Sequence, residues 1–130
     1  IYGYNGELPN VNIIGKVNHV NLPDIYNQHR FYLQLSMSES FGLSLCEAIM
    51  CGCIPVVSDV GMMAEIVGHF GYVLKEKDQK QLDQLINLAI DQNVNDNIGL
   101  MDKRRVSVIE RFDQDIRKKA LIDVINKLTL

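Results

Sequence analysis

An apolar strand, a turn of small residues, an apolar helix and a second apolar strand follow one another in the first half of the chain. The first strand is expected at Phe31–Leu35, which gives way to a turn containing three serines. The helix is expected at Gly42–Met50, because Gly52 stops the apolar run. The second strand, Ile54–Ser58, is apolar almost throughout, as is typical of a parallel strand covered on both faces. The pattern predicts an α/β fold built on a parallel sheet.

The start of the expected helix is where this unit would bind an anion. The first amides of a helix, here around Phe41 to Ser44, have no acceptor within the helix, and the helix dipole favours negative charge there. Gly42 has no side chain, so a ligand can approach its backbone closely. Ligands of open parallel sheets bind outside the carboxyl ends of the strands, where this turn falls. The sequence therefore predicts that a phosphate binds at the turn.

Two glutamates, Glu39 and Glu47, flank this helix start. Glu47 lies about five residues into the helix, roughly 7 Å below its start, so a phosphate bound at the helix would leave a nucleotide ribose beside it. Carboxylates accept hydrogen bonds from paired hydroxyls, as an acidic residue does for ribose in dinucleotide folds. Glu39 precedes the turn, where a carboxylate would repel phosphate oxygens. Its expected partner is therefore a hydroxyl-rich group, a sugar.

The stretch from Ser36 to Val57 resembles the signature of retaining glycosyltransferases of group one, family four. The resemblance rests on the spacing of Glu39 and Glu47, which have seven residues between them, and on the sequence Phe-Gly-Leu within that interval. It also rests on the strand that follows, which contains a proline. Other parts of the chain that are similar to this family are residues 12–17, 59–67, 71–74 and 112–128. Two positions depart from the family pattern, because Ser40 and Met62 stand where glycine is common.

The resemblance implies a GT-B fold, in which two Rossmann-like domains, each a doubly wound parallel sheet, face each other across a cleft. Residues 1–130 would then be part of the C-terminal, nucleotide-sugar-binding domain, with residues 113–130 as its terminal helix. The resemblance also implies roles for single residues. Glu39 would be catalytic and contact the donor sugar, Glu47 would bind the ribose, and backbone groups would hold the diphosphate at Phe41, Gly42 and Leu43. The segment near the base would contain Gly15, Lys16 and Val17.

The activity implied by the resemblance is transfer of a sugar from a nucleotide-diphosphate sugar to an acceptor glycan or glycolipid. The anomeric configuration would be retained, with no cofactor and no metal bound by the enzyme. The expected setting is polysaccharide or glycolipid assembly in the cytoplasm, at the inner face of a membrane. Two other functions fit the same fold: a noncatalytic regulatory or partner-binding module, and a sugar-nucleotide epimerase of the GT-B type. The spacing of the two glutamates favours the transferase.

Composition excludes several other classes of protein. A net charge of -3 argues against a nucleic-acid binder, and no apolar run reaches the ~18 residues that span a bilayer. The three cysteines are an odd number on apolar segments, without a paired His or Cys cluster. We expect them to be buried thiols in a reducing compartment, not ligands of a zinc site or parts of a disulfide framework.

The remaining expected elements include the strands Ile1–Gly3, Val11–Ile14 and Tyr72–Leu74. The expected helices are Leu22–Gln28, Met62–Val67, Gln79–Ile90, Ile98–Arg111 and Gln114–Leu128. The loop between the expected strands Ile1–Gly3 and Val11–Ile14 is too short for a parallel crossover, which needs a dozen or more residues. We therefore expect the domain to be incomplete at its N-terminal side. Because the N-terminal domain of the family is also missing, we expect the isolated chain to be inactive.

Overall fold

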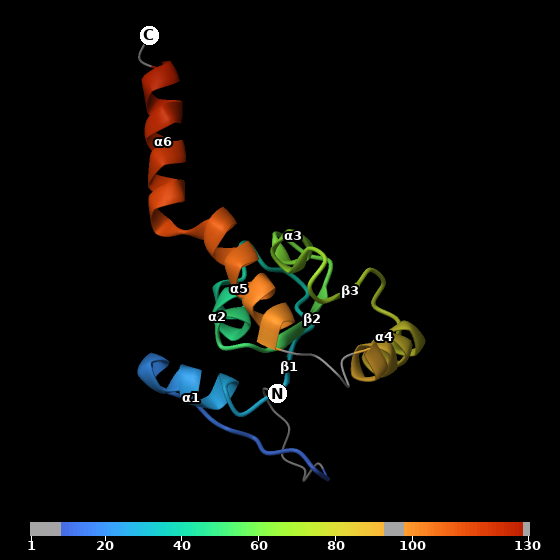
Figure 1. Cartoon of the computed structure of the whole chain (residues 1–130). Helices are drawn as coiled ribbons and strands as arrows, with labels where there is room; N and C mark the ends of the chain where they lie inside the picture. Colours follow the sequence, from blue (N-terminus) through green and yellow to red (C-terminus); the bar gives the residue numbers. More distant parts are fainter. Residues whose placement is uncertain (1–8, 93–97, 129–130) are drawn as a thin grey trace.

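A computed structural model describes residues 9–92 and 98–128 of the chain (Figure 1). Its centre is a three-stranded parallel sheet with the order β1-β2-β3. The strands are β1 (Phe31–Gln34), β2 (Ile54–Ser58) and β3 (Tyr72–Leu74). Helix α2 (Leu43–Met50) connects the first pair of strands and α3 (Met63–Val67) the second, as parallel neighbours require. This architecture confirms the predicted α/β, Rossmann-like fold.

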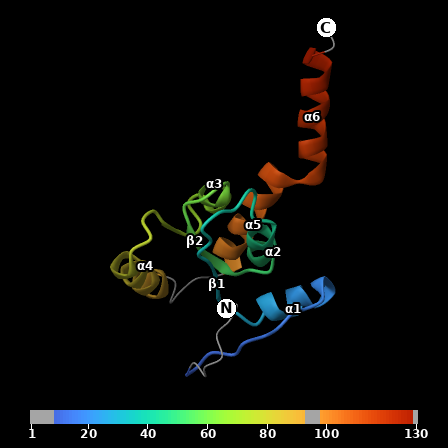
Figure 2. The same ribbon diagram turned by 180° about the vertical axis from the view of Figure 1, so that it is seen from behind.

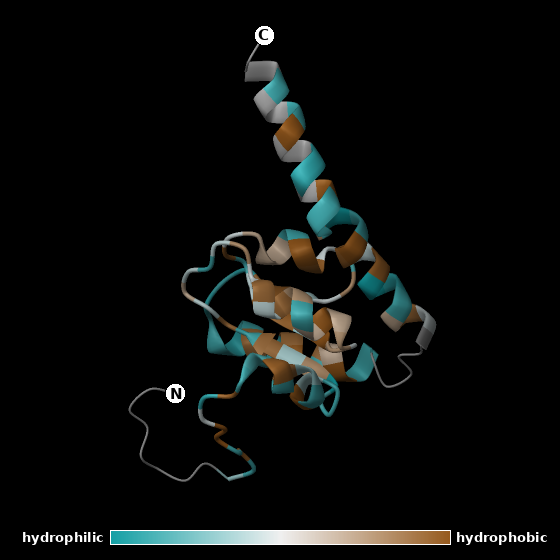
Figure 3. Ribbon diagram, turned by 90° about the vertical axis from the view of Figure 1, so that its left-hand side faces the viewer, coloured by the Kyte–Doolittle hydropathy of each residue, from teal (hydrophilic) through white to brown (hydrophobic). Residues whose placement is uncertain are grey.

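Helices cover both faces of the sheet. On one face, α2 and α3 pack against Val57 and form the main core together with Val108 of α5 (Ile98–Phe112). On the other face lies α4 (Gln79–Gln92), which contacts β3 (Figure 2). All five residues of β2 are buried, which agrees with the strand predicted to be covered on both sides. Apolar residues gather in the sheet and in the helices beside it (Figure 3).

Two segments lie outside this core. The short helices η1 (His19–Asn21) and α1 (Leu22–Tyr26) precede β1, and α1 contacts α2. The last helix, α6 (Gln114–Leu128), contacts α5 and extends away from the rest of the molecule in both views (Figures 1 and 2).

Two arginines of α5 fasten this helix to the ends of α2 and α3. The Arg105 Nε donates to the carbonyl of Met50 at 2.9 Å, at the C-terminal end of α2. The Arg111 guanidinium donates to the carbonyls of Glu65 and Ile66 at 2.6 and 2.9 Å, in the last turn of α3. Carbonyl groups in the last turn of a helix have no amide donor within that helix. The two arginines supply donors to these carbonyls, which would otherwise need water.

The predicted strand Val11–Ile14 is wrong. Residues 11–18 are irregular, and Val11, Ile13 and Ile14 are 49%, 60% and 60% exposed. An apolar segment becomes a strand only when its backbone pairs with a neighbour, and in the described part of the chain β1 pairs on one side alone, with β2. The predicted strand Ile1–Gly3 lies outside the described residues. The other predicted elements are present, with ends shifted by at most two residues.

The apolar stripe of α4 is less buried than its spacing predicts. The helical spacing of apolar residues predicts a core stripe made of Leu82, Leu85, Ile86, Ala89 and Ile90. Ala89 is 1% exposed, as this spacing predicts. Ile90, however, is 49% exposed. It borders a small apolar gap between α4 and the edge strand, next to Leu33, which is also 49% exposed. The end of the stripe is therefore not fully packed against the sheet.

Candidate functional site

The turn after β1 is held in place by the residues that follow β2. The hydroxyl of the buried Ser58 donates to the carbonyl of Ser36 at 2.7 Å, and the Met62 amide donates to the carbonyl of Ser40 at 3.3 Å. Gly61 adopts a φ of 54°, and a Cβ at this position would collide with the carbonyls of Glu39 and Ser40. The two loops at the carboxyl edge of the sheet are therefore packed directly against each other.

Gly42 turns the chain into α2. Its φ of 92° lies in the left-handed region, which favours glycine, and a Cβ there would contact Met63 and Ile66. Helical bonding then begins with Leu45 and Cys46, whose amides donate to the Gly42 carbonyl at 3.1 and 3.2 Å. An α-helix leaves its first amides without acceptors of its own, so this start can receive an anion.

Glu39 stands just before this helix, with both carboxylate oxygens bonded. Its Oε2 accepts a hydrogen bond from the amide nitrogen of Gln34 at 3.0 Å, and its Oε1 accepts one from the backbone amide of Ser40 at 3.0 Å. The side chain is half-buried, at the carboxyl end of β1. Each oxygen of a carboxylate has two lone pairs, so Glu39 can still accept bonds from ligand hydroxyls.

Glu47 lies in the second turn of the same helix. Its side chain is 26% exposed, and its Oε1 lies 2.9 Å from the Nε2 of His19, which is 76% exposed. Glu39 therefore lies before the start of α2 and Glu47 in its second turn, and the second carboxylate oxygen of Glu47 is not part of the contact with His19.

Comparison of the sequence with known protein families identifies the family of this chain. The sequence model of the family described as "Glycosyl transferases group 1" matches residues 5–111. The chain belongs to this family. The match includes the helix start and both glutamates, and it agrees with the parallel α/β sheet.

The names of several related proteins mention different sugars. The N-acetyl-alpha-D-glucosaminyl L-malate synthase of Bacillus anthracis is 35% identical over 95 residues, which are 71% of this chain and 24% of that protein. The O-antigen chain mannosyltransferase B of Escherichia coli is 35% identical over 68 residues, 52% of this chain and 18% of that protein. A third relative is the phosphatidylinositol N-acetylglucosaminyltransferase GPI3 subunit of Saccharomyces cerevisiae, 33% identical over 82 residues, 62% of this chain and 18% of that protein. The chain thus spans about a quarter or less of their length.

The segment expected near the base is largely exposed to solvent. Gly15 and Lys16 are exposed, Val17 is half-buried, and no atom lies within 4 Å of the place where a Cβ of Gly15 would be. Three residues after Lys16, His19 reaches Glu47. The chain just after this segment therefore lies beside α2, while Gly15 and Lys16 themselves are exposed to solvent.

Sequence reasoning missed Gln34, which holds Glu39. The residue is the amide side chain in an otherwise apolar and aromatic strand, and a polar group in a covered strand needs a hydrogen-bond partner. The presence of this polar residue in an apolar strand was the signal in the sequence that could have identified Gln34. The partner could not be read from the sequence, because it depends on the path of the turn that returns Glu39 to the strand.

The three cysteines are free thiols, and Cys46 and Cys53 are buried, as predicted. Cys51 is half-buried. Burial raises the pKa of all three thiols, so they stay protonated near neutral pH. The Cys53 thiol donates to the carbonyls of Tyr26 and His29 at 3.3 and 3.4 Å, which ties α1 to the start of β2. Cys53 thus has a structural role.

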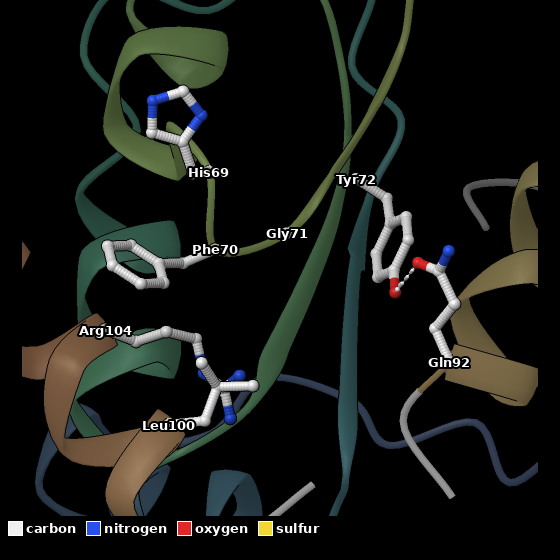
Figure 4. A pocket seen from close by; sticks show the side chains of 7 residues that line it. All are labelled: His69, Phe70, Gly71, Tyr72, Gln92, Leu100 and Arg104. Carbon is white, nitrogen blue, oxygen red and sulfur yellow. Dashed lines mark hydrogen bonds between the residues drawn. The ribbon is translucent and has the colours of Figure 1, made fainter.

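A separate pocket of about 240 Å³ lies at the start of β3, at the amino-terminal end of that strand (Figure 4). Phe70, Leu100 and Arg104 lie on one side of it, and on the other side the Tyr72 hydroxyl donates to Gln92 at 3.0 Å. Neither glutamate lines this pocket. Ligands of parallel sheets bind at the carboxyl ends of the strands, so this pocket is not the candidate site.

No helix within the described ranges is both long and apolar enough to cross a membrane.

Proposed function

We propose that this chain is the donor-binding part of a longer glycosyltransferase, which moves a sugar from a nucleotide-diphosphate sugar to an acceptor with retention of configuration. The observation that carries the proposal is that Glu39 is held beside the end of β1, just before α2, while Glu47 lies in the second turn of α2. Membership of the group 1 glycosyltransferases supports it. The names of the relatives, which mention N-acetylglucosamine and mannose, support a sugar donor without fixing which sugar.

The donor diphosphate would bind at the backbone of Phe41, Gly42 and Leu43. The helix dipole and the amides of the first helical turn favour an anion there, and the left-handed Gly42 turns the chain into this helix. As the sugar leaves, negative charge grows on the diphosphate, and fixed amide dipoles stabilise this charge without reorganising. The leaving phosphate would then help to take the proton from the acceptor hydroxyl.

The two carboxylates would hold the neutral parts of the donor. Glu39 would accept hydrogen bonds from hydroxyls of the transferred sugar, and Glu47 would accept bonds from the ribose. The contact between Glu47 and His19 does not prevent this, since His19 is 76% exposed and can move into solvent. Gly15, Lys16 and Val17 would lie near the base once the donor is bound.

The rest of the enzyme would supply the acceptor site. We place that site, and the opposite wall of the cleft, in an N-terminal domain, and we expect this chain alone to be inactive. The acceptor would be a glycan or glycolipid, assembled in the cytoplasm at the inner face of a membrane, and the reaction would need no metal bound by the enzyme.

The test is calorimetric titration of the full-length protein with a panel of nucleotide-diphosphate sugars, repeated for Glu47→Gln. Loss of a charged hydrogen bond is worth about 1.5 to 3 kcal/mol, so affinity should fall tenfold or more. Glu110→Gln is the matched control, because Glu110 is an exposed glutamate on α5. Unchanged affinity in Glu47→Gln contradicts the ribose role. Product analysis completes the test, since a free epimerised sugar nucleotide contradicts transfer.

A further inference from the structure

A chain of hydrogen bonds connects the interior of the sheet to Glu39. The Tyr32 hydroxyl lies 3.0 Å from the amide oxygen of Gln34 and 3.1 Å from the hydroxyl of Ser44. The Ser44 hydroxyl also lies 3.4 Å from the Gln34 oxygen. The Gln34 nitrogen then donates to Glu39 at 3.0 Å and to the Ser36 hydroxyl at 3.4 Å. β1, the turn and α2 each contribute to this network.

The network fixes which way the Gln34 amide points. Tyr32 and Ser44 offer hydroxyl donors on one side, so the Gln34 oxygen faces them and its nitrogen faces Glu39. A reversed amide would place its oxygen against the Glu39 carboxylate, where two acceptors repel each other. Tyr32 is itself half-buried, packed against the main core and in edge contact with Tyr26. The donor that Gln34 presents to Glu39 is therefore held by rigid parts of the fold.

We propose that Gln34 is a positioning residue that holds the Glu39 carboxylate in the orientation needed to bind the transferred sugar. The inference rests on the function proposed above for Glu39. Without the Gln34 nitrogen, the Ser40 amide would be the one hydrogen-bond donor to the carboxylate among the described residues, and a glutamate side chain loses the freedom of several rotatable bonds on binding. Gln34 thus controls affinity for the sugar part of the donor and leaves affinity for the nucleotide part unchanged.

The test compares two probes on full-length protein. One is the nucleotide-diphosphate sugar that the unmodified protein binds most tightly in the calorimetric panel, and the other is the same nucleoside diphosphate without the sugar. Gln34→Met removes the amide but keeps an unbranched side chain of similar length. We expect its affinity for the nucleotide sugar to fall about tenfold, with its affinity for the nucleoside diphosphate unchanged. Tyr32→Phe should act in the same direction, by about threefold, because Ser44 still faces the Gln34 oxygen.

Leu33→Met is the control, since Leu33 lies beside Gln34 on the strand but lines the gap under α4 on the other face. It should leave both affinities unchanged. In a Glu39→Gln background, Gln34→Met should have no further effect on sugar binding, because the carboxylate that it positions is gone.

The outcomes separate this inference from the proposed function. If Glu39→Gln weakens sugar binding and Gln34→Met does not, the positioning role is overturned and the proposed function stands. Equal losses for both probes in Gln34→Met also overturn it, since they indicate general damage to the fold. If Glu39→Gln leaves sugar binding unchanged, or the unmodified protein binds no nucleotide sugar, the proposed function fails and the role of Gln34 fails with it.

Discussion

The start of α2 and the segment at residues 11–17 are both expected to contact the donor, yet their surroundings differ sharply. Around the helix start, Gly61 is pressed against the backbone of Glu39, and the loops are joined by hydrogen bonds. Along residues 11–17, Gly15 has open space around it and the apolar side chains of Val11, Ile13 and Ile14 face solvent. The difference teaches that the proposed phosphate and sugar side of the site is held by contacts within the described part of the chain. The segment proposed for the base side is exposed to solvent instead.

The largest effect is expected from adding a methyl group at Gly61. In Gly61→Ala the new Cβ meets the carbonyls of Glu39 and Ser40, so the turn before α2 must shift. We expect the free energy of unfolding in urea to fall by about 3 kcal/mol or more and donor binding to be lost.

Gly15→Ala is the matched variant in the other region. No atom lies within 4 Å of its new methyl group, so a change within about 0.5 kcal/mol is expected. Equal destabilisation by the two substitutions would contradict the comparison between the regions.

A smaller loss is expected from Arg111→Ala. The guanidinium donates to two carbonyls at the end of α3 and lies 5.0 Å from the ring centroid of Phe112, so the variant leaves those carbonyls unsatisfied and loosens α5. The free energy of unfolding should fall by about 1–3 kcal/mol. Lys103→Ala on the exposed side of the same helix should change it little, and a loss as large as that of Arg111→Ala would refute the capping role.

The buried thiols predict a loss of stability at high pH. Burial raises the pKa of Cys46 and Cys53 above the ordinary value of 9.0. A raised folded-state pKa favours the neutral thiol in the folded state, so its stabilisation is complete below about pH 9 and is lost as the pH rises through the folded values. Urea unfolding at pH 7 and pH 10 should show a decrease of about 1 kcal/mol or more, which becomes smaller in Cys53→Ala. An unchanged decrease in that variant would remove Cys53 from the explanation.

The smallest effect is expected from His19→Gln, which tests the contact between the two regions. His19 is 76% exposed where it meets Glu47, so the pair is screened by water and should contribute about 0.5 kcal/mol or less to stability. Donor affinity should change less than threefold. A tenfold loss, measured by calorimetry on full-length protein, would mean that His19 itself contacts the donor.

The helices, the three paired strands and the two flanking glutamates could be predicted because their signals are local. Apolar spacing and a glycine that stops an apolar run depend on residues close in sequence. The strand predicted at Val11–Ile14 failed for the opposite reason, since strand formation depends on a partner elsewhere in the chain. Gln34 was missed in the same way, because its bond to Glu39 appears only when the turn folds back.

The most direct test is a crystal structure of the full-length protein with its nucleotide-diphosphate sugar. The account predicts that the diphosphate lies within hydrogen-bond distance of the backbone amides near Gly42 and Leu43. It also predicts a ribose hydroxyl on Glu47 and the sugar on Glu39. A nucleotide bound instead in the pocket of Figure 4, or both carboxylates turned away from the donor, would contradict it.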